Sequence, residues 1–177
     1  MGLATKITDL QLQAGASFIA PGVSFNGTTS HIRYANDFVG GFTDQLAISF
    51  WCKPIGTPSA NFPIIIGSPD GGGDTGEVFI TLRKRDSSVC GFFANFEGAG
   101  DSGADFSILD AGINIGSWNH IMFAFNGTTA KTMSVNGATK TLTATYNTTD
   151  YFPSGSTADT WLGGSETGSG DGVTNEY

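Results

Sequence analysis

The segment 119–125 constrains the fold of this chain more than any other stretch of its sequence. Its large apolar side chains stand at every second position, at Ile121, Phe123 and Phe125. This period of two is typical of a β-strand with one buried face. The Asn-Gly pairs 126–127 and 136–137 follow, and Asn-Gly supplies the positive φ angles that tight hairpin turns require. The segment therefore predicts antiparallel strands joined by short turns.

The same pattern recurs along the chain. The segment 46–53 alternates and ends at Pro54, which cannot donate to a sheet ladder. The apolar run 62–67 predicts a central strand, and the segments 23–34 and 77–96 predict hairpins. Glycine is frequent, with 26 among 177 residues, which suits many short strands and tight turns. The sequence predicts an all-β fold, a two-sheet antiparallel β-sandwich.

We expect two parts in the chain. Residues 1–20 predict a lead-in that forms a first strand or an arm docking on a neighbour, because the apolar side chains of Leu10, Leu12, Phe18 and Ile19 are costly to leave in water. Residues 21–177 predict the sandwich itself.

Charge and hydropathy exclude several classes of partner. The net charge is −8, and the one basic cluster, 83–85, is expected on a solvated strand edge, so nucleic acid is not an expected partner. No apolar run is long enough for a membrane span. The first 22 residues show no export signal, which predicts a soluble protein that does not use the general export route.

Cys52 and Cys90 are the only cysteines. Both lie in apolar surroundings within predicted strands, and we expect two free, buried thiols. A disulfide between them stays open, because it would need Cα atoms within about 7 Å.

Several motifs in order resemble the concanavalin A-like lectin/glucanase superfamily, in its laminin-G-like form. These motifs are Phe25-Asn26-Gly27, the strand 48–54 with its Ser-Phe-Trp-Cys-Lys-Pro end, Gly116-Ser117-Trp118-Asn119-His120, Ser134-Val135-Asn136-Gly137 and Leu162-Gly163-Gly164. The resemblance implies a jelly roll. Members usually close with one more strand, which would start where this chain stops at 173–177. We therefore expect the final strand to be missing from the chain, and its open C-terminal edge to invite strand addition from a partner.

Catalytic carboxylates are not found along any single predicted strand. Retaining glycosidases hold two carboxyl groups about 5–5.5 Å apart, a pair that alternation would place at i and i+2 or i+4 of one strand. The glutamates Glu77, Glu97, Glu166 and Glu176 lack such a partner. The two histidines, His31 and His120, are expected to be structural. The sequence predicts a protein that is not an enzyme.

Two kinds of binding site remain. The resemblance implies a calcium ion at the sandwich rim, and hard oxygen ligands on loops suit that ion. The candidate ligands for Ca²⁺ are Asp70, Asp74, Asp101, Asp105 and Asp171. Glycan binding would use an aromatic ring to stack on a sugar, and the candidates are Tyr151, Phe152 and Trp161. These three rings can also pack beneath their own loop. Trp51 and Trp118 are expected in the core.

The resemblance extends to stand-alone modules of tailed-phage structural proteins. It implies a non-catalytic attachment, adhesion or decoration module on a virion surface, with host cell-surface glycans as ligands. Other virion proteins would contact residues 1–20 and the open C-terminal edge, and a homo-oligomer stays open. The alternatives are a purely structural protein that stabilises a capsid or tail, and a calcium-dependent lectin module of a bacterial surface protein, which would be extracellular.

Overall fold

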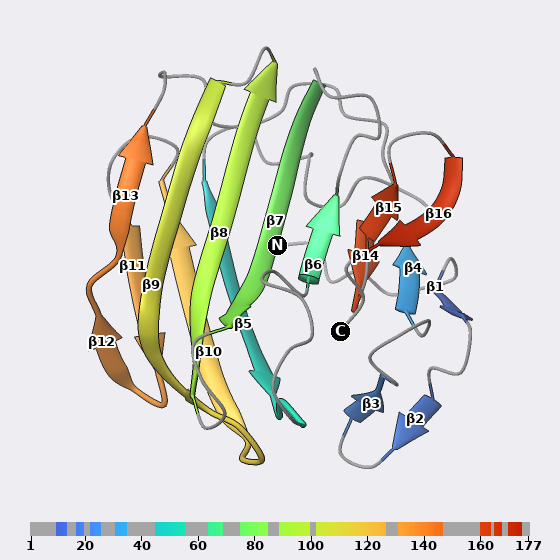
Figure 1. The fold of residues 1–177 in the computed structure, drawn as a ribbon, viewed down its shortest axis with the longest axis horizontal. Coiled ribbons are helices and arrows are strands. Elements are labelled where there is room, and N and C mark those ends of the chain that lie inside the picture. Colours follow the sequence, from blue (N-terminus) through green and yellow to red (C-terminus); the bar gives the residue numbers. More distant parts are fainter. Residues whose placement is uncertain are drawn as a thin grey trace, which may run out of the picture.

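A computed structural model gives the fold (Figure 1). It describes residues 10–13, 17–19, 22–25, 31–34, 45–55, 64–68, 75–84, 89–99, 102–126, 131–146, 160–163, 165–167 and 170–174. These ranges contain sixteen strands and no helix, so none of them offers a helix that could cross a bilayer. The predicted all-β class is confirmed.

The larger sheet has eight antiparallel strands in the order β1-β4-β14-β6-β7-β8-β9-β13. Its members are β1 (Leu10–Gln13), β4 (His31–Tyr34), β6 (Ile64–Ser68), β7 (Thr75–Lys84), β8 (Val89–Ala99), β9 (Ser102–Asn114), β13 (Thr143–Tyr146) and β14 (Thr160–Leu162). The predicted hairpin across 86–88 is confirmed as β7 paired with β8. The predicted central strand is confirmed as β6, which lies between β14 and β7.

The smaller sheet has four strands in the order β12-β11-β10-β5. Its members are β5 (Leu46–Cys52), β10 (Asn119–Phe125), β11 (Lys131–Val135) and β12 (Ala138–Lys140). In Figure 1 it lies behind the part of the larger sheet formed by β7, β8, β9 and β13. The chain passes from the smaller sheet to the larger one between β12 and β13, where Leu142 is buried.

Two further hairpins complete the described structure. One pairs β2 (Ser17–Ile19) with β3 (Gly22–Ser24), and the other pairs β15 (Ser165–Thr167) with β16 (Gly170–Thr174). The predicted hairpin over 23–34 is therefore wrong. β3 pairs with β2, the strand that precedes it in the chain, and β4 pairs with β1 and β14. In the predicted lead-in, Leu10–Gln13 forms β1 and pairs with β4.

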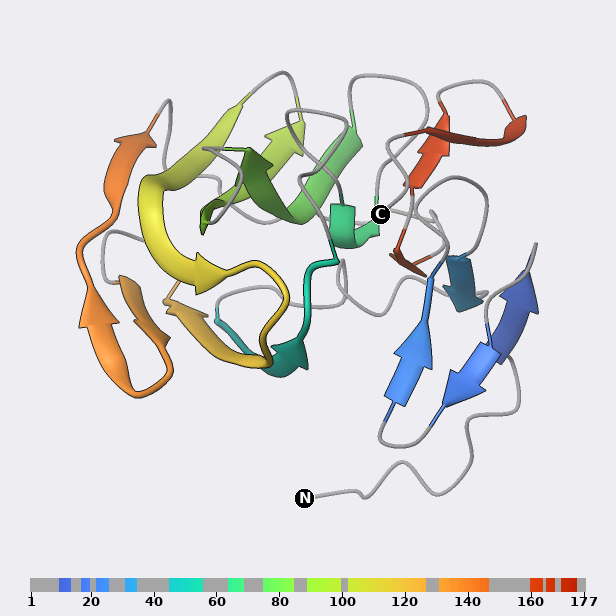
Figure 2. The same cartoon turned by 60° about the horizontal axis from the view of Figure 1, so that its bottom comes forward.

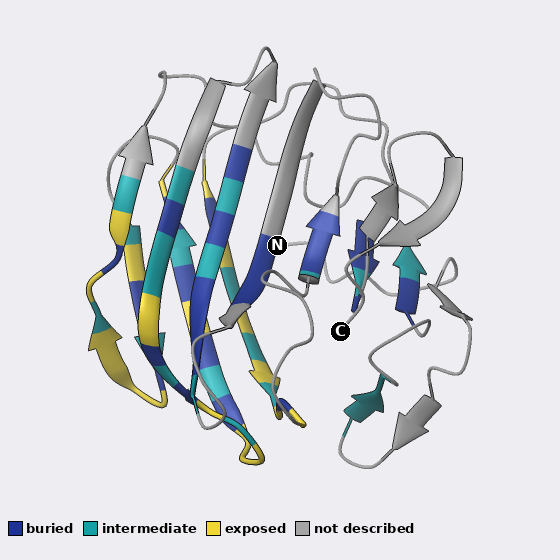
Figure 3. Ribbon diagram, in the orientation of Figure 1, coloured by how far each residue is buried: buried dark blue, intermediate teal, exposed yellow. Residues whose placement is uncertain are grey.

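Phenylalanine rings fill the space between the sheets. Phe92, Phe96 and Phe106 of the larger sheet and Phe123 of the smaller one are fully buried. The ring centroid of Phe123 lies 5.6 Å from that of Phe92, 5.8 Å from that of Phe96 and 5.6 Å from that of Phe106. Figure 3 shows the resulting alternation of buried and more exposed residues along β8. The predicted inward face of 119–125 is confirmed.

An irregular pairing bends β9. Phe92 pairs with Ile108 but Cys90 pairs with Ile113, so β9 carries extra residues opposite Gly91, as in a β-bulge. A Cβ atom on Gly91 would stand 2.4 Å from the Ile108 carbonyl oxygen, so only glycine lets the two backbones approach this closely. Figure 2 shows β9 curving from the larger sheet toward the smaller one, which brings the turn before β10 into place.

The two cysteines are free thiols, as predicted. Cys90 is fully buried, and Cys52 is half-buried against the same core. Burial raises the pKa of the Cys52 thiol from its ordinary value of 9.0 to about 12, with a further contribution from the nearby Cys90 thiol. The neutral thiol is therefore the form that the folded state favours.

The raised pKa of Cys52 predicts slow alkylation. At pH 8 the native protein should react with iodoacetamide about a thousandfold more slowly at Cys52 than the protein unfolded in urea, because the thiolate is the nucleophile. In addition, the free energy of unfolding should fall as the pH rises from 9.0 toward 12, because the folded state then binds more protons than the unfolded state. Mass spectrometry of alkylated peptides measures the rate, and equal rates in both states would contradict the prediction.

Candidate functional site

The outer face of the larger sheet carries a group of half-exposed side chains. On β8, Cys90, Phe92, Ala94 and Phe96 point into the core, so the intervening positions lie on the outer face. Four residues there, on β8 and β9, are neither buried nor fully exposed. We call them the larger-sheet surface: Phe93, Asn95, Asp105 and Ser107. The register pairs Phe93 with Ser107 and Asn95 with Asp105, so the four residues form a compact square.

A hydrogen bond fixes the polar half of this square. Asn95 Nδ2 donates to Asp105 Oδ1 over 2.8 Å. This bond sets the orientation of the amide, because the opposite orientation would place Asn95 Oδ1 against the carboxylate. Asn95 Oδ1 is itself buried and has no hydrogen-bond partner, and an acceptor in that state costs about 1–3 kcal/mol. The square thus offers one positioned carboxylate and one half-exposed aromatic ring.

Trp161 lies on the same face but is not an exposed platform. It is 5% exposed, its ring centroid lies 4.8 Å from that of His31, and the Arg33 guanidinium carbon lies 5.6 Å from its centroid. The predicted stacking of a sugar on Trp161 therefore needs correction, because the His31 ring and the Arg33 guanidinium group lie against the indole and the side chain is buried. Its Nε1 is buried without a partner, as is the hydroxyl of Thr81, which also lies on this face.

The predicted calcium ligands are not brought together within the described part of the chain. Asp105 belongs to strand β9, not to the loop that was expected, and its Oδ1 is bonded to Asn95. Asp171 lies in β16. The other calcium candidates, Asp70, Asp74 and Asp101, fall outside the described residues. The predicted glycan ligands Tyr151 and Phe152 also fall outside them. Among the residues searched, none forms a metal-binding group of three, and calcium binding stays a prediction.

A carboxylate pair escaped the analysis of single strands. The register places Glu77 of β7 directly opposite Glu97 of β8. Cross-strand neighbours have Cβ atoms about 4.5–5.5 Å apart. The predicted hairpin already implied this pair, because residues 77 and 97 lie equally far from a turn centred at residue 87 and therefore face each other across the two strands. Paired carboxylates must therefore be sought across strands as well as along them.

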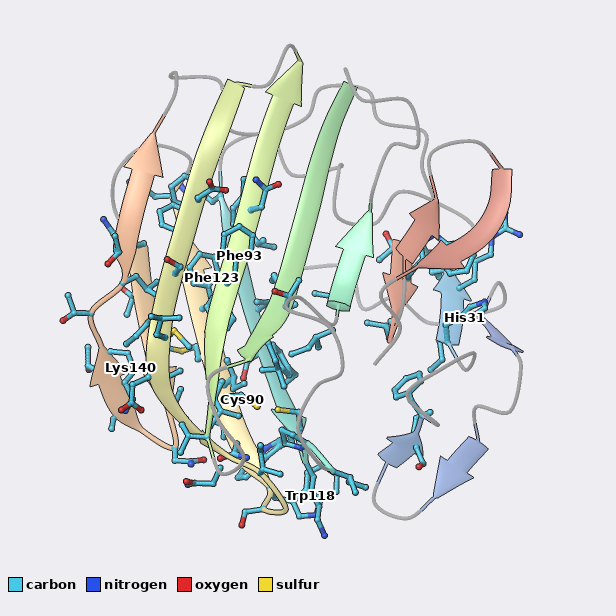
Figure 4. All side chains as sticks on the ribbon, in the orientation of Figure 1. His31, Cys90, Phe93, Trp118, Phe123 and Lys140 are labelled. Carbon is cyan, nitrogen blue, oxygen red and sulfur yellow. The ribbon has the colours of Figure 1, made fainter. Side chains whose placement is uncertain are left out.

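Two tryptophans expected in the core lie on the surface instead. Trp51 is 64% exposed and Trp118 is 45% exposed. Trp51 alternates with core-facing neighbours on β5 and so points outward. Trp118 precedes β10 at the end of the sandwich labelled in Figure 4. The prediction was wrong because alternation fixes which residues share a face and leaves open which face is buried.

His120 has the structural role that was predicted. Its Nε2 lies 2.8 Å from Ser49 Oγ, and its backbone N–H donates to Asn136 Oδ1 over 2.8 Å. Its ring centroid lies 5.0 Å from that of Trp51. The imidazole therefore joins β10 to β5 on the outer face of the smaller sheet.

Comparison with known proteins agrees with this architecture. A family model described as the concanavalin A-like lectin/glucanases superfamily matches residues 26–174. Comparison with curated proteins gave no match. The match covers every residue of the larger-sheet surface.

Proposed function

Because the chain belongs to the concanavalin A-like lectin/glucanase superfamily, we propose that it is a non-catalytic carbohydrate-binding module that serves in attachment or adhesion. The observation that carries the proposal is the 2.8 Å hydrogen bond between Asn95 and Asp105 beside the half-exposed ring of Phe93. Binding sites for small polar ligands combine an apolar wall with a few well-placed polar groups, and this square supplies both.

The proposed ligand is a pyranose whose C–H face rests on Phe93. Its hydroxyl groups would donate to the carboxylate of Asp105, which the hydrogen bond from Asn95 Nδ2 holds in place. Ser107, paired with Phe93 in the register, stands at the border of the same sugar.

The binding site predicts a specific mutational pattern. Asn95→Ala should weaken binding to the best ligand on an array of neutral and acidic glycans by about tenfold, or roughly 1.4 kcal/mol. Asp105→Ala should do the same, because it removes the carboxylate that binds the sugar, whereas Asn95→Ala removes the amide that positions this carboxylate. Leu109→Ala is the matched control, since Leu109 lies on β9 and is exposed. Unchanged binding in both site variants would place the ligand elsewhere.

Glycoside hydrolysis is a second candidate because of the Glu77–Glu97 pair. Retaining hydrolysis uses one carboxyl group as nucleophile and another as acid. Release of reducing sugar from a bound polysaccharide, abolished by Glu97→Gln and by Glu77→Gln, would establish this activity. Binding without release supports the non-catalytic proposal.

A further inference from the structure

The outer face of the smaller sheet carries an exposed aromatic ring in a fixed position. Trp51 is 64% exposed, while Phe50 and Cys52 on either side of it pack against the core. The register sets Trp51 opposite His120 and Ser49 opposite Met122. We call these four residues the Trp51 surface. It lies on the opposite side of the sandwich from Phe93, Asn95 and Asp105.

The neighbouring groups brace this ring. The His120 ring lies 5.0 Å from Trp51, centroid to centroid, with the two planes tilted by 37°. The hydrogen bond of 2.8 Å between His120 Nε2 and Ser49 Oγ holds the imidazole from the other side. The backbone of His120 is bonded twice to Asn136, at 2.8 Å in each case. The ring therefore loses little conformational entropy when a ligand covers it, which favours binding.

The surroundings of Trp51 are richer in hydroxyl groups than in apolar groups. Met122 is 37% exposed and is the one other large apolar side chain of the described outer face between β5 and β12. The other positions of this face are the paired Ala47 and Ala124, and Ser134, Thr132 and Thr139 on the two strands beyond. The centres of protein–protein interfaces are enriched in tryptophan and methionine but depleted in serine and alanine, and here Trp51 and Met122 share the face with Ser49, Ala47 and Ala124. An exposed tryptophan with polar groups beside it, here Ser49 and His120, is suited to stacking on a sugar.

We infer that Trp51 is the stacking platform of a second saccharide site, independent of the site on the larger sheet. A pyranose ring would lay its C–H face on the indole, with its hydroxyl groups bonded to Ser49 and His120. The ligand class is a pyranoside chain long enough to reach from Trp51 across Met122 toward Ser134. A domain with sites on both outer faces binds two glycan chains at once and joins them.

The test uses the full chain and two matched variants. Wild type, Trp51→Ala and Leu109→Ala are compared on a glycan array, and the soluble hexasaccharide of each bound glycan is then titrated calorimetrically. We expect Trp51→Ala to weaken at least one ligand by about tenfold and to leave the melting temperature within a few degrees, because the side chain is exposed. Trp51→Phe should retain an intermediate affinity, since it keeps a smaller ring.

Two results would overturn the inference. In the first, Trp51→Ala binds every glycan as wild type does. In the second, Trp51→Ala changes the sedimentation coefficient without changing glycan binding, which would make this face a contact between copies of the chain. The proposed site on the larger sheet is tested separately. It would be contradicted if Asn95→Ala and Asp105→Ala left glycan binding unchanged while Trp51→Ala weakened it.

Discussion

Replacing Phe123 with alanine should lower the free energy of unfolding by about 3–5 kcal/mol, as expected for a large aromatic side chain deleted from a packed core. Phe123 is fully buried and contacts three aromatic rings of the opposite sheet within 6 Å. Its removal leaves a cavity in the middle of the interface between the sheets. Urea denaturation measures the loss, and the melting temperature should fall by roughly 10 °C.

Met122→Ala is the control for this substitution. Met122 is the next residue on the same strand but points outward and is 37% exposed. Its replacement should change the free energy of unfolding by about 0.5 kcal/mol or less, as is usual for surface positions. Equal losses at 122 and 123 would mean that the two faces of β10 have been assigned wrongly.

Asn119→Ala should cost about 3 kcal/mol, because it removes four partly buried hydrogen bonds made by one side chain. Asn119 is fully buried. Its Nδ2 donates to the carbonyls of Asn114 and Ser117 over 2.9 and 2.7 Å, and its Oδ1 accepts from the Asn114 N–H over 3.0 Å and from Asn136 Nδ2 over 3.3 Å. One side chain thus holds the turn that carries Trp118. Thermal unfolding followed by circular dichroism measures the loss.

Asn114→Ala controls for the amide itself. Asn114 contributes its backbone N–H and carbonyl to this network, while its side chain is exposed. The variant should retain the stability of wild type to within about 0.5 kcal/mol. If both variants lost the same amount, the backbone of the turn would be responsible, and the role given to the Asn119 side chain would be wrong.

The sequence predicted the parts of the fold that depend on local periodicity. Alternation located the strand at 119–125 and the hairpin of β7 and β8, both of which the structure confirms. It did not predict that β3 pairs with β2, because Asn26-Gly27 is an equally good turn signal for a hairpin that the chain does not form. Pairing between distant strands depends on the packing of the whole sandwich, which local periodicity does not specify.

The sequence did not predict which residues lie together on the outer face of the larger sheet. Asp105 was expected on a loop as a calcium ligand, and the structure places it in β9, bonded to Asn95 on the neighbouring strand. Trp51 was expected in the core and is 64% exposed, while Trp161, for which a packed position had stayed open, is 5% exposed. Both outcomes depend on which of two faces of a sheet is covered, and a period of two is the same for either face.

The alternation of β8 and β10 has a practical consequence for protein engineering. Randomising the codons for 93, 95 and 122 would vary outward-facing positions of both sheets and leave the core sequence unchanged, because the intervening positions pack in the core. With both outer faces binding sugars as proposed, selection on immobilised sugars would yield variants with a separately chosen specificity on each face.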